Sequence, residues 1–148
     1  MPDTPEPAPP AAGADSPSQP PTGVYLGFDY GEKRIGVAVG DTVARRPRPL
    51  DTIDNQTRQR WSRIAELIEQ WRPQGLVVGV PLTLDDERQA MTDAAERFCR
   101  RLKGRYHLPV YPAEERMTSL EADLQPVAGQ SRDAVAAAQI LADWLGRD

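Results

Sequence analysis

The chain has 148 residues, a formal net charge of −4 and a single cysteine, Cys99. This length suits one domain with its own core. One cysteine excludes an internal disulfide and is typical of a reducing compartment, so we expect a cytoplasmic protein. No apolar run reaches the length of a membrane span, so we expect a soluble protein with no membrane contact.

Residues 1–22 differ in composition from the rest of the chain. They hold eight of the 15 prolines, three acids and no lysine or arginine. Such a segment has too few apolar side chains to offset the entropy of ordering, so we predict a disordered tail before a folded domain over 23–148. Because the tail's acids supply most of the net charge, the domain is nearly neutral. Any nucleic-acid site therefore has to be a local patch.

Residues 24–40 hold two short apolar runs on either side of a polar, glycine-containing tip. Apolar and other residues alternate in both runs, which predicts a β-hairpin. Asp29 lies near the end of the first run, where folding would remove water from its carboxylate. That loss requires a metal ion, a cation or several N–H donors in compensation. Alternatively, Asp29 accepts backbone hydrogen bonds at the entrance to the hairpin.

The middle of the chain alternates between strand and helix patterns. Residues 45–53 are basic and interrupted by prolines, which predicts a short edge strand. Residues 57–71 carry apolar side chains at helical spacing, and Pro73 ends that helix. Residues 75–82 form a continuous apolar run, which is typical of a strand covered by helices on both faces.

The last third of the chain completes an α/β pattern. The predicted elements are a helix over 87–103 closed by Gly104, a strand over 108–111 limited by Pro112, a helix over 118–124, and a last helix that Ser131 caps. An antiparallel meander followed by β-α-β crossovers gives a mixed five-stranded sheet with helices on both faces. In such sheets ligands gather at the carboxyl ends of parallel strands.

Three acids occupy positions that the predicted sheet could bring together. Asp29 lies in the first strand, Glu115 just beyond a later strand and Asp133 in the first turn of the last helix. Divalent cations would neutralise the repulsion between them, and two Mg²⁺ or Mn²⁺ ions would support phosphodiester hydrolysis. Alternatively, Asp133 complements the helix dipole, and Glu115 pairs with Arg116 or Arg132.

Four short segments, in order along residues 24–145, carry a resemblance to a known family. They are GFDYGEKRIGVA at 27–38, VGVPL at 78–82, ERMTS at 115–119 and DAVAA at 133–137. These segments are similar to the signature blocks of the bacterial YqgF/RuvX family. The resemblance implies a ribonuclease H-like fold. It also implies a hydrolase of nucleic acid, described as Holliday-junction resolvase-like and as a nuclease that matures the 5′ end of precursor 16S rRNA in ribosome biogenesis.

The resemblance also implies roles for individual residues. The family's catalytic, metal-binding acids correspond to Asp29, Glu115 and Asp133, which we expect to hold Mg²⁺ or Mn²⁺, as two ions. The chain has Glu114 where the family usually has aspartate.

The basic residue that follows the hairpin glycine in the family corresponds to Arg34. With Lys33 beside it and Arg116 in the third block, we expect these cations to hold the substrate phosphate. The expected partner is structured RNA or branched DNA, and a homodimer would suit a two-fold symmetric junction.

Two other functions fit parts of the sequence. A nearly neutral domain lacks the basic field with which many nucleases hold their substrates, so the chain could be a catalytically weak module that binds nucleic acid or ribosome-assembly partners. A glycine-containing hairpin after an Asp-bearing strand also occurs in actin-like nucleotide sites. That alternative needs a second large domain, for which this chain is too short.

Overall fold

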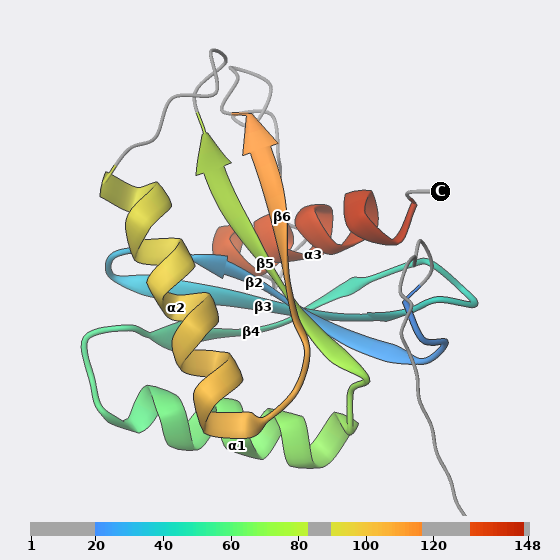
Figure 1. Ribbon diagram of the computed structural model, residues 1–148, viewed down its shortest axis with the longest axis horizontal. Helices are drawn as coiled ribbons and strands as arrows, with labels where there is room; N and C mark the ends of the chain where they lie inside the picture. The colour runs from blue at the N-terminus through green and yellow to red at the C-terminus, as the bar shows by residue number, and fades with distance from the viewer. Residues whose placement is uncertain (1–19, 83–89, 117–130, 147–148) are drawn as a thin grey trace, which may run out of the picture.

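The computed structural model describes residues 20–82, 90–116 and 131–146 (Figure 1). Most of the predicted tail and the predicted helix over 118–124 lie outside the described residues. No helix in the described ranges combines the length and the apolar character that crossing a bilayer requires.

Five strands form one mixed sheet in the order β4-β3-β2-β5-β6. Their bounds are Val24–Tyr30 for β2, Arg34–Asp41 for β3, Arg48–Asp54 for β4, Gly75–Leu82 for β5 and Val110–Arg116 for β6. The pairs β2–β3 and β3–β4 are antiparallel, and the pairs β2–β5 and β5–β6 are parallel. The predicted hairpin, basic edge strand and mixed five-stranded sheet are therefore confirmed.

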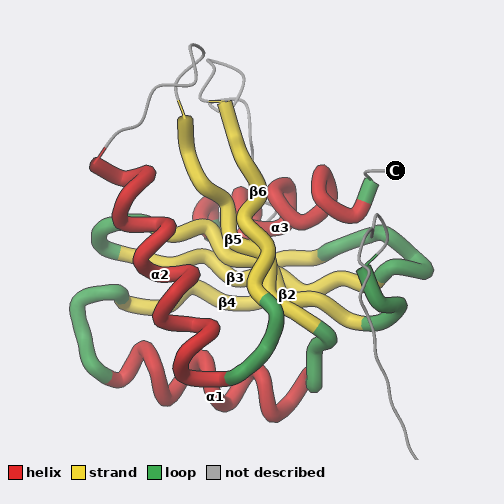
Figure 2. Tube along the Cα trace, in the orientation of Figure 1, coloured by secondary structure: helices red, strands yellow, loops and turns green. Residues whose placement is uncertain are grey.

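Helices cover both faces of the sheet, as predicted. The helices α1 (Gln59–Trp71) and α2 (Ala90–Tyr106) pack on one face, and α3 (Arg132–Leu145) packs on the other (Figures 1 and 2). Successive side chains of β2 point to opposite faces of the sheet, so this strand contributes to the core on each face. Leu26 and Phe28 join the core under α1 and α2, whereas Tyr25 joins the core under α3.

Two predicted boundaries are wrong by a few residues. Helix α2 continues past Gly104 to Tyr106, whose hydroxyl donates a 2.7 Å hydrogen bond to the Trp61 carbonyl. His107, with φ of 57°, then ends the helix. Strand β6 runs through Pro112 to Arg116. An edge strand tolerates proline because the missing N–H can fall on the open side.

Candidate active site

Asp29 lies in β2 on the face that α3 covers, since it follows Tyr25 by an even number of residues. Its side chain is partly buried, and burial raises the pKa of its carboxyl to about 6, with the negative charge of Asp133 as a second cause. Among the described residues, no group donates a hydrogen bond to this carboxylate or forms an ion pair with it. Within the described ranges, the charge of Asp29 is therefore uncompensated.

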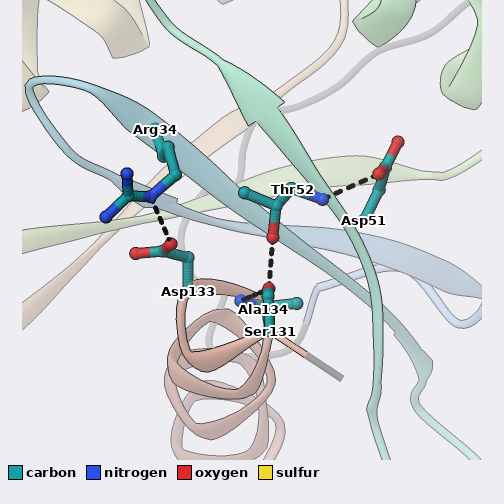
Figure 3. Close-up of polar contacts among 6 residues, drawn as sticks. All are labelled: Arg34, Asp51, Thr52, Ser131, Asp133 and Ala134. Carbon is teal, nitrogen blue, oxygen red and sulfur yellow. Dashed lines mark hydrogen bonds and ion pairs between the residues drawn. The ribbon is translucent and has the colours of Figure 1, made fainter. Parts of the chain in front are cut away.

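A glycine of β3 lets the first turn of α3 approach Asp29. Gly36 is the register partner of Asp29, and a Cβ on Gly36 would lie only 1.9 Å from the carbonyl oxygen of Asp133. The Oγ of Ser131 accepts a 3.0 Å hydrogen bond from the N–H of Ala134, which confirms the predicted N-cap. The same hydroxyl also hydrogen-bonds Thr52 of β4 (Figure 3). Two neighbouring strands thus fix the position of Asp133.

Arg34, at the start of β3, balances the negative charge of Asp133. Its Nε donates to Oδ2 of Asp133 over 2.9 Å (Figure 3). The Arg34 side chain is 61% exposed and that of Asp133 is 31% exposed, so water reaches the ion pair. Sequence reasoning placed Arg34 near substrate but did not foresee this partner, which lies on the last helix.

Glu115 lies inside β6, as the register partner of Pro81, rather than beyond the strand as predicted. A Cβ on Gly79 would lie 3.0 Å from Oε1 of Glu115, so this carboxylate extends over Gly79. Phe28 of β2 is the register partner of Val78 of β5. The next residues along these two neighbouring strands are Asp29 and Gly79. Glu115 therefore lies on the same face as Asp29, across β5.

The three acids share one face of the sheet, but as placed they are not closed around a common point. Within the described residues, no three His, Cys, Asp or Glu side chains are grouped closely enough to hold a metal ion. The charge of Asp133 acts on Asp29, and Glu115 extends over Gly79 of β5, on the other side of Asp29 from β3.

The other predicted phosphate-binding residues lie at two edges of the same region. Lys33 is exposed in the tip between β2 and β3, where Asn55 steadies the backbone by donating from its N–H to the Lys33 carbonyl over 2.9 Å. Arg116 is the last residue of β6 and pairs with Leu82, and its side chain is outside the described part of the chain.

Sequence reasoning missed Gly36 and Thr52 as residues that build this site. The available signal was the run of glycines and alanine that alternates with Ile35, Val37 and Val39, which leaves one face of β3 without bulk. A strand face without side chains admits a close helix.

A family model described as RuvX, Holliday junction resolvase, matches residues 23–147. The chain belongs to the RuvX family. The match spans all three acids and begins next to the predicted domain boundary.

Curated relatives in the RuvX family extend over most of the chain. A protein of Hydrogenovibrio crunogenus is 42% identical over 130 residues, which cover 86% of this chain and 97% of the relative. One of Chromobacterium violaceum is 47% identical over 130 residues, covering 81% and 95%. Both relatives carry the name "Putative pre-16S rRNA nuclease".

Two solved structures resemble this chain in fold. Thermus thermophilus RuvC, in complex with a Holliday junction substrate, aligns with a TM-score of 0.55 and 17% identity over 82% of this chain and 92% of that one. Fowlpox virus resolvase, in complex with Holliday junction DNA, aligns with a TM-score of 0.53 and 10% identity over 84% and 99%. These likenesses confirm the ribonuclease H-like fold, and at such identities they speak for the fold only.

Proposed function

We propose that this RuvX-family protein is a nuclease that hydrolyses phosphodiester bonds with the help of divalent cations, and that precursor 16S rRNA is its substrate. The name shared by the curated relatives supports the substrate. The observation that carries the chemistry is the carboxylate of Asp29, partly buried beside Asp133 and compensated by no other described residue. A reducing cytoplasm, where ribosomes assemble, fits both the free Cys99 and this substrate.

The chemistry of the site fits a hard divalent cation. Burial and a neighbouring negative charge both disfavour ionised Asp29, and a bound cation reverses both effects. The donors on this face are carboxylate oxygens, which Mg²⁺ and Mn²⁺ prefer to nitrogen or sulfur. We therefore assign Asp29, Glu115 and Asp133 as the residues that would hold the metal, as two ions.

Each side chain has a separate task in this proposal. When bound, the metal supplies an activated water and stabilises the leaving oxygen. The three carboxylates would hold the metal's positive charge on one face of the sheet. Arg34 turns from Asp133 to a phosphate oxygen of the substrate, and its fork of N–H donors can bind two oxygens at once. Lys33 and Arg116 add charge beside the same phosphate.

Branched DNA is a second candidate substrate, because the matching family model is described as a Holliday junction resolvase. A metal site that acts on the backbone does not distinguish the two nucleic acids by itself. A homodimer would place two sites on a two-fold symmetric junction.

Cleavage of a substrate panel tests the proposal. Labelled precursor rRNA, single-stranded RNA and a four-way DNA junction are incubated with Mg²⁺ or Mn²⁺ and with wild type, Asp29→Asn or Asp143→Asn. Asp143 is an exposed acid of the same helix as Asp133, bound to Gln139, and serves as the matched control. We expect cleavage by wild type and Asp143→Asn only. Equal cleavage by wild type and Asp29→Asn would show that the assigned residues are not the catalytic site.

The same panel separates the nuclease from a binding module. Wild type that binds the RNA but cleaves nothing with either metal, while Asp29→Asn binds equally well, would support the module and contradict the nuclease.

A further inference from the structure

Helices α1 and α2 carry a group of arginines. Both helices pack on the face of the sheet opposite α3 (Figures 1 and 2). The guanidinium carbons of Arg60, Arg101 and Arg105 lie 5.2, 5.1 and 4.4 Å from the centroid of the Trp61 ring. Trp61 itself is buried, so its ring serves as a fixed platform under three cations.

Arg97 extends this group along α2. Arg97, Arg101 and Arg105 are spaced four residues apart, so they lie along one stripe of the helix, and all three are exposed. We call Arg60, Arg97, Arg101 and Arg105 the arginine patch. Like charges four residues apart on a helix repel one another, so this arrangement works against the stability of α2.

The arginine patch has no acidic counterpart in the described part of the chain. Arg34, Arg63 and Arg72 each form an ion pair with a nearby acid. The four arginines of the patch form none with any described residue, and Arg60 donates only to the carbonyl of Thr57. Arg45, Arg58 and Arg100 form no ion pair with a described residue either, so the patch is distinguished by the convergence of three guanidinium groups over one ring. This density of positive charge marks the patch as a place where the negative charge comes from another molecule.

We propose that the arginine patch is a second nucleic-acid contact, which binds the phosphodiester backbone of a duplex segment remote from the cleaved bond. Guanidinium groups bind two phosphate oxygens at once, and a row of them matches the repeating charge of a backbone. The inference rests on the proposed function for the identity of the polyanion. The sheet separates the patch from the acids, so binding and cleavage can be altered independently.

Binding of a labelled RNA duplex in metal-free buffer tests the inference. We compare wild type with Arg101→Gln/Arg105→Gln and with Arg63→Gln/Arg72→Gln, a control that removes the same charge from two ion-paired arginines. The patch variant is expected to bind roughly tenfold more weakly, and its plot of log affinity against log salt should be shallower by about two. The control should bind like wild type. A DNA duplex of the same sequence shows whether the contact distinguishes the two backbones.

Two results would overturn the inference: equal binding by wild type and the patch variant, or an equal loss in the control, which would reflect net charge only. Arginine-dependent binding of polyglutamate without binding of RNA would point to an acidic protein partner and would also overturn it. Circular dichroism and Tm show that each variant is folded. If the patch binds RNA while wild type cleaves no substrate, the proposed function fails and this inference stands.

Discussion

At the level of single residues, Asp29 is expected to make stability depend on pH. Burial and the charge of Asp133 raise the pKa of Asp29 from its ordinary value of 3.8 to about 6 in the folded chain. Between these values the folded state binds more protons than the unfolded state, so the free energy of unfolding falls as pH rises from about 4 to about 6 and then levels off. The cost at neutral pH is roughly 3 kcal/mol.

Asp29→Asn should remove this cost. In the absence of metal we expect the variant to be more stable than wild type at pH 7, by up to about 3 kcal/mol, and the two to converge below pH 4. Urea unfolding of both proteins at a series of pH values measures the difference. A gap that does not change with pH would show that Asp29 is not the titrating group.

Arg34 allows stability and activity to be separated. Its ion pair with Asp133 is exposed to water, so Arg34→Gln should change the free energy of unfolding by less than about 1 kcal/mol. If Arg34 holds the substrate phosphate, the same change should raise KM or lower kcat, with Arg34→Lys intermediate because lysine lacks the guanidinium fork.

The matched control is Arg72→Gln, which removes a more exposed ion pair, with Glu69, far from the acids. It should leave both kinetic constants unchanged. Normal kinetics for Arg34→Gln would exclude Arg34 from phosphate binding.

The sequence supports predictions about Asp29 but not about the partner of Arg34. The apolar run around Asp29 is local, so the loss of water on folding can be anticipated from neighbouring residues. The Arg34–Asp133 pair joins residues 99 positions apart, and their contact depends on how closely α3 packs on β3. No pattern among neighbouring residues could predict this contact.

At the level of elements, the packing of α3 on β3 depends on the absence of a side chain. A Cβ on Gly36 would lie 1.9 Å from one backbone oxygen of Asp133, and the backbone there cannot move aside as a flexible side chain would. Gly36→Ala should therefore lower the free energy of unfolding by about 3 kcal/mol and reduce activity, because α3 is pushed off the sheet.

Gly104→Ala is the control with the opposite sign. No atom lies within 4 Å of a Cβ built there, and Gly104 is inside α2. Alanine should stabilise the helix by roughly 0.5–1 kcal/mol. Thermal or urea unfolding measures both variants, and a neutral Gly36→Ala would show that the helix does not rest on that strand.

Elements with a strong local signal were predicted with accurate bounds. The apolar run at 75–82 became β5 over the same residues, and the cap at Ser131 starts α3. Boundaries that depend on distant contacts were missed: Tyr106 extends α2 by reaching Trp61, and pairing with β5 extends β6 through Pro112. Those contacts exist only after the layers have packed.

At the level of the whole molecule, the acids assigned to the metal come from the first strand, the last strand and the last helix. In the unfolded chain they are far apart, so the cation should bind the folded state and stabilise it by mass action. A cation at about 100 times its Kd should raise the free energy of unfolding by roughly 2.7 kcal/mol.

Thermal unfolding with increasing Mg²⁺ or Mn²⁺ measures this gain without relying on cleavage. The Tm of wild type and of Asp143→Asn should rise with metal, whereas the Tm of Asp29→Asn should rise much less. This variant lacks one metal ligand, and it also lacks the buried negative charge that a cation would neutralise. The order of stability of wild type and Asp29→Asn at neutral pH should thus reverse as the metal approaches about 1,000 times its Kd, where binding adds roughly 4.1 kcal/mol. An equal rise in all three proteins would mean that the ions act elsewhere. In that case the convergence of the acids has no role in binding metal.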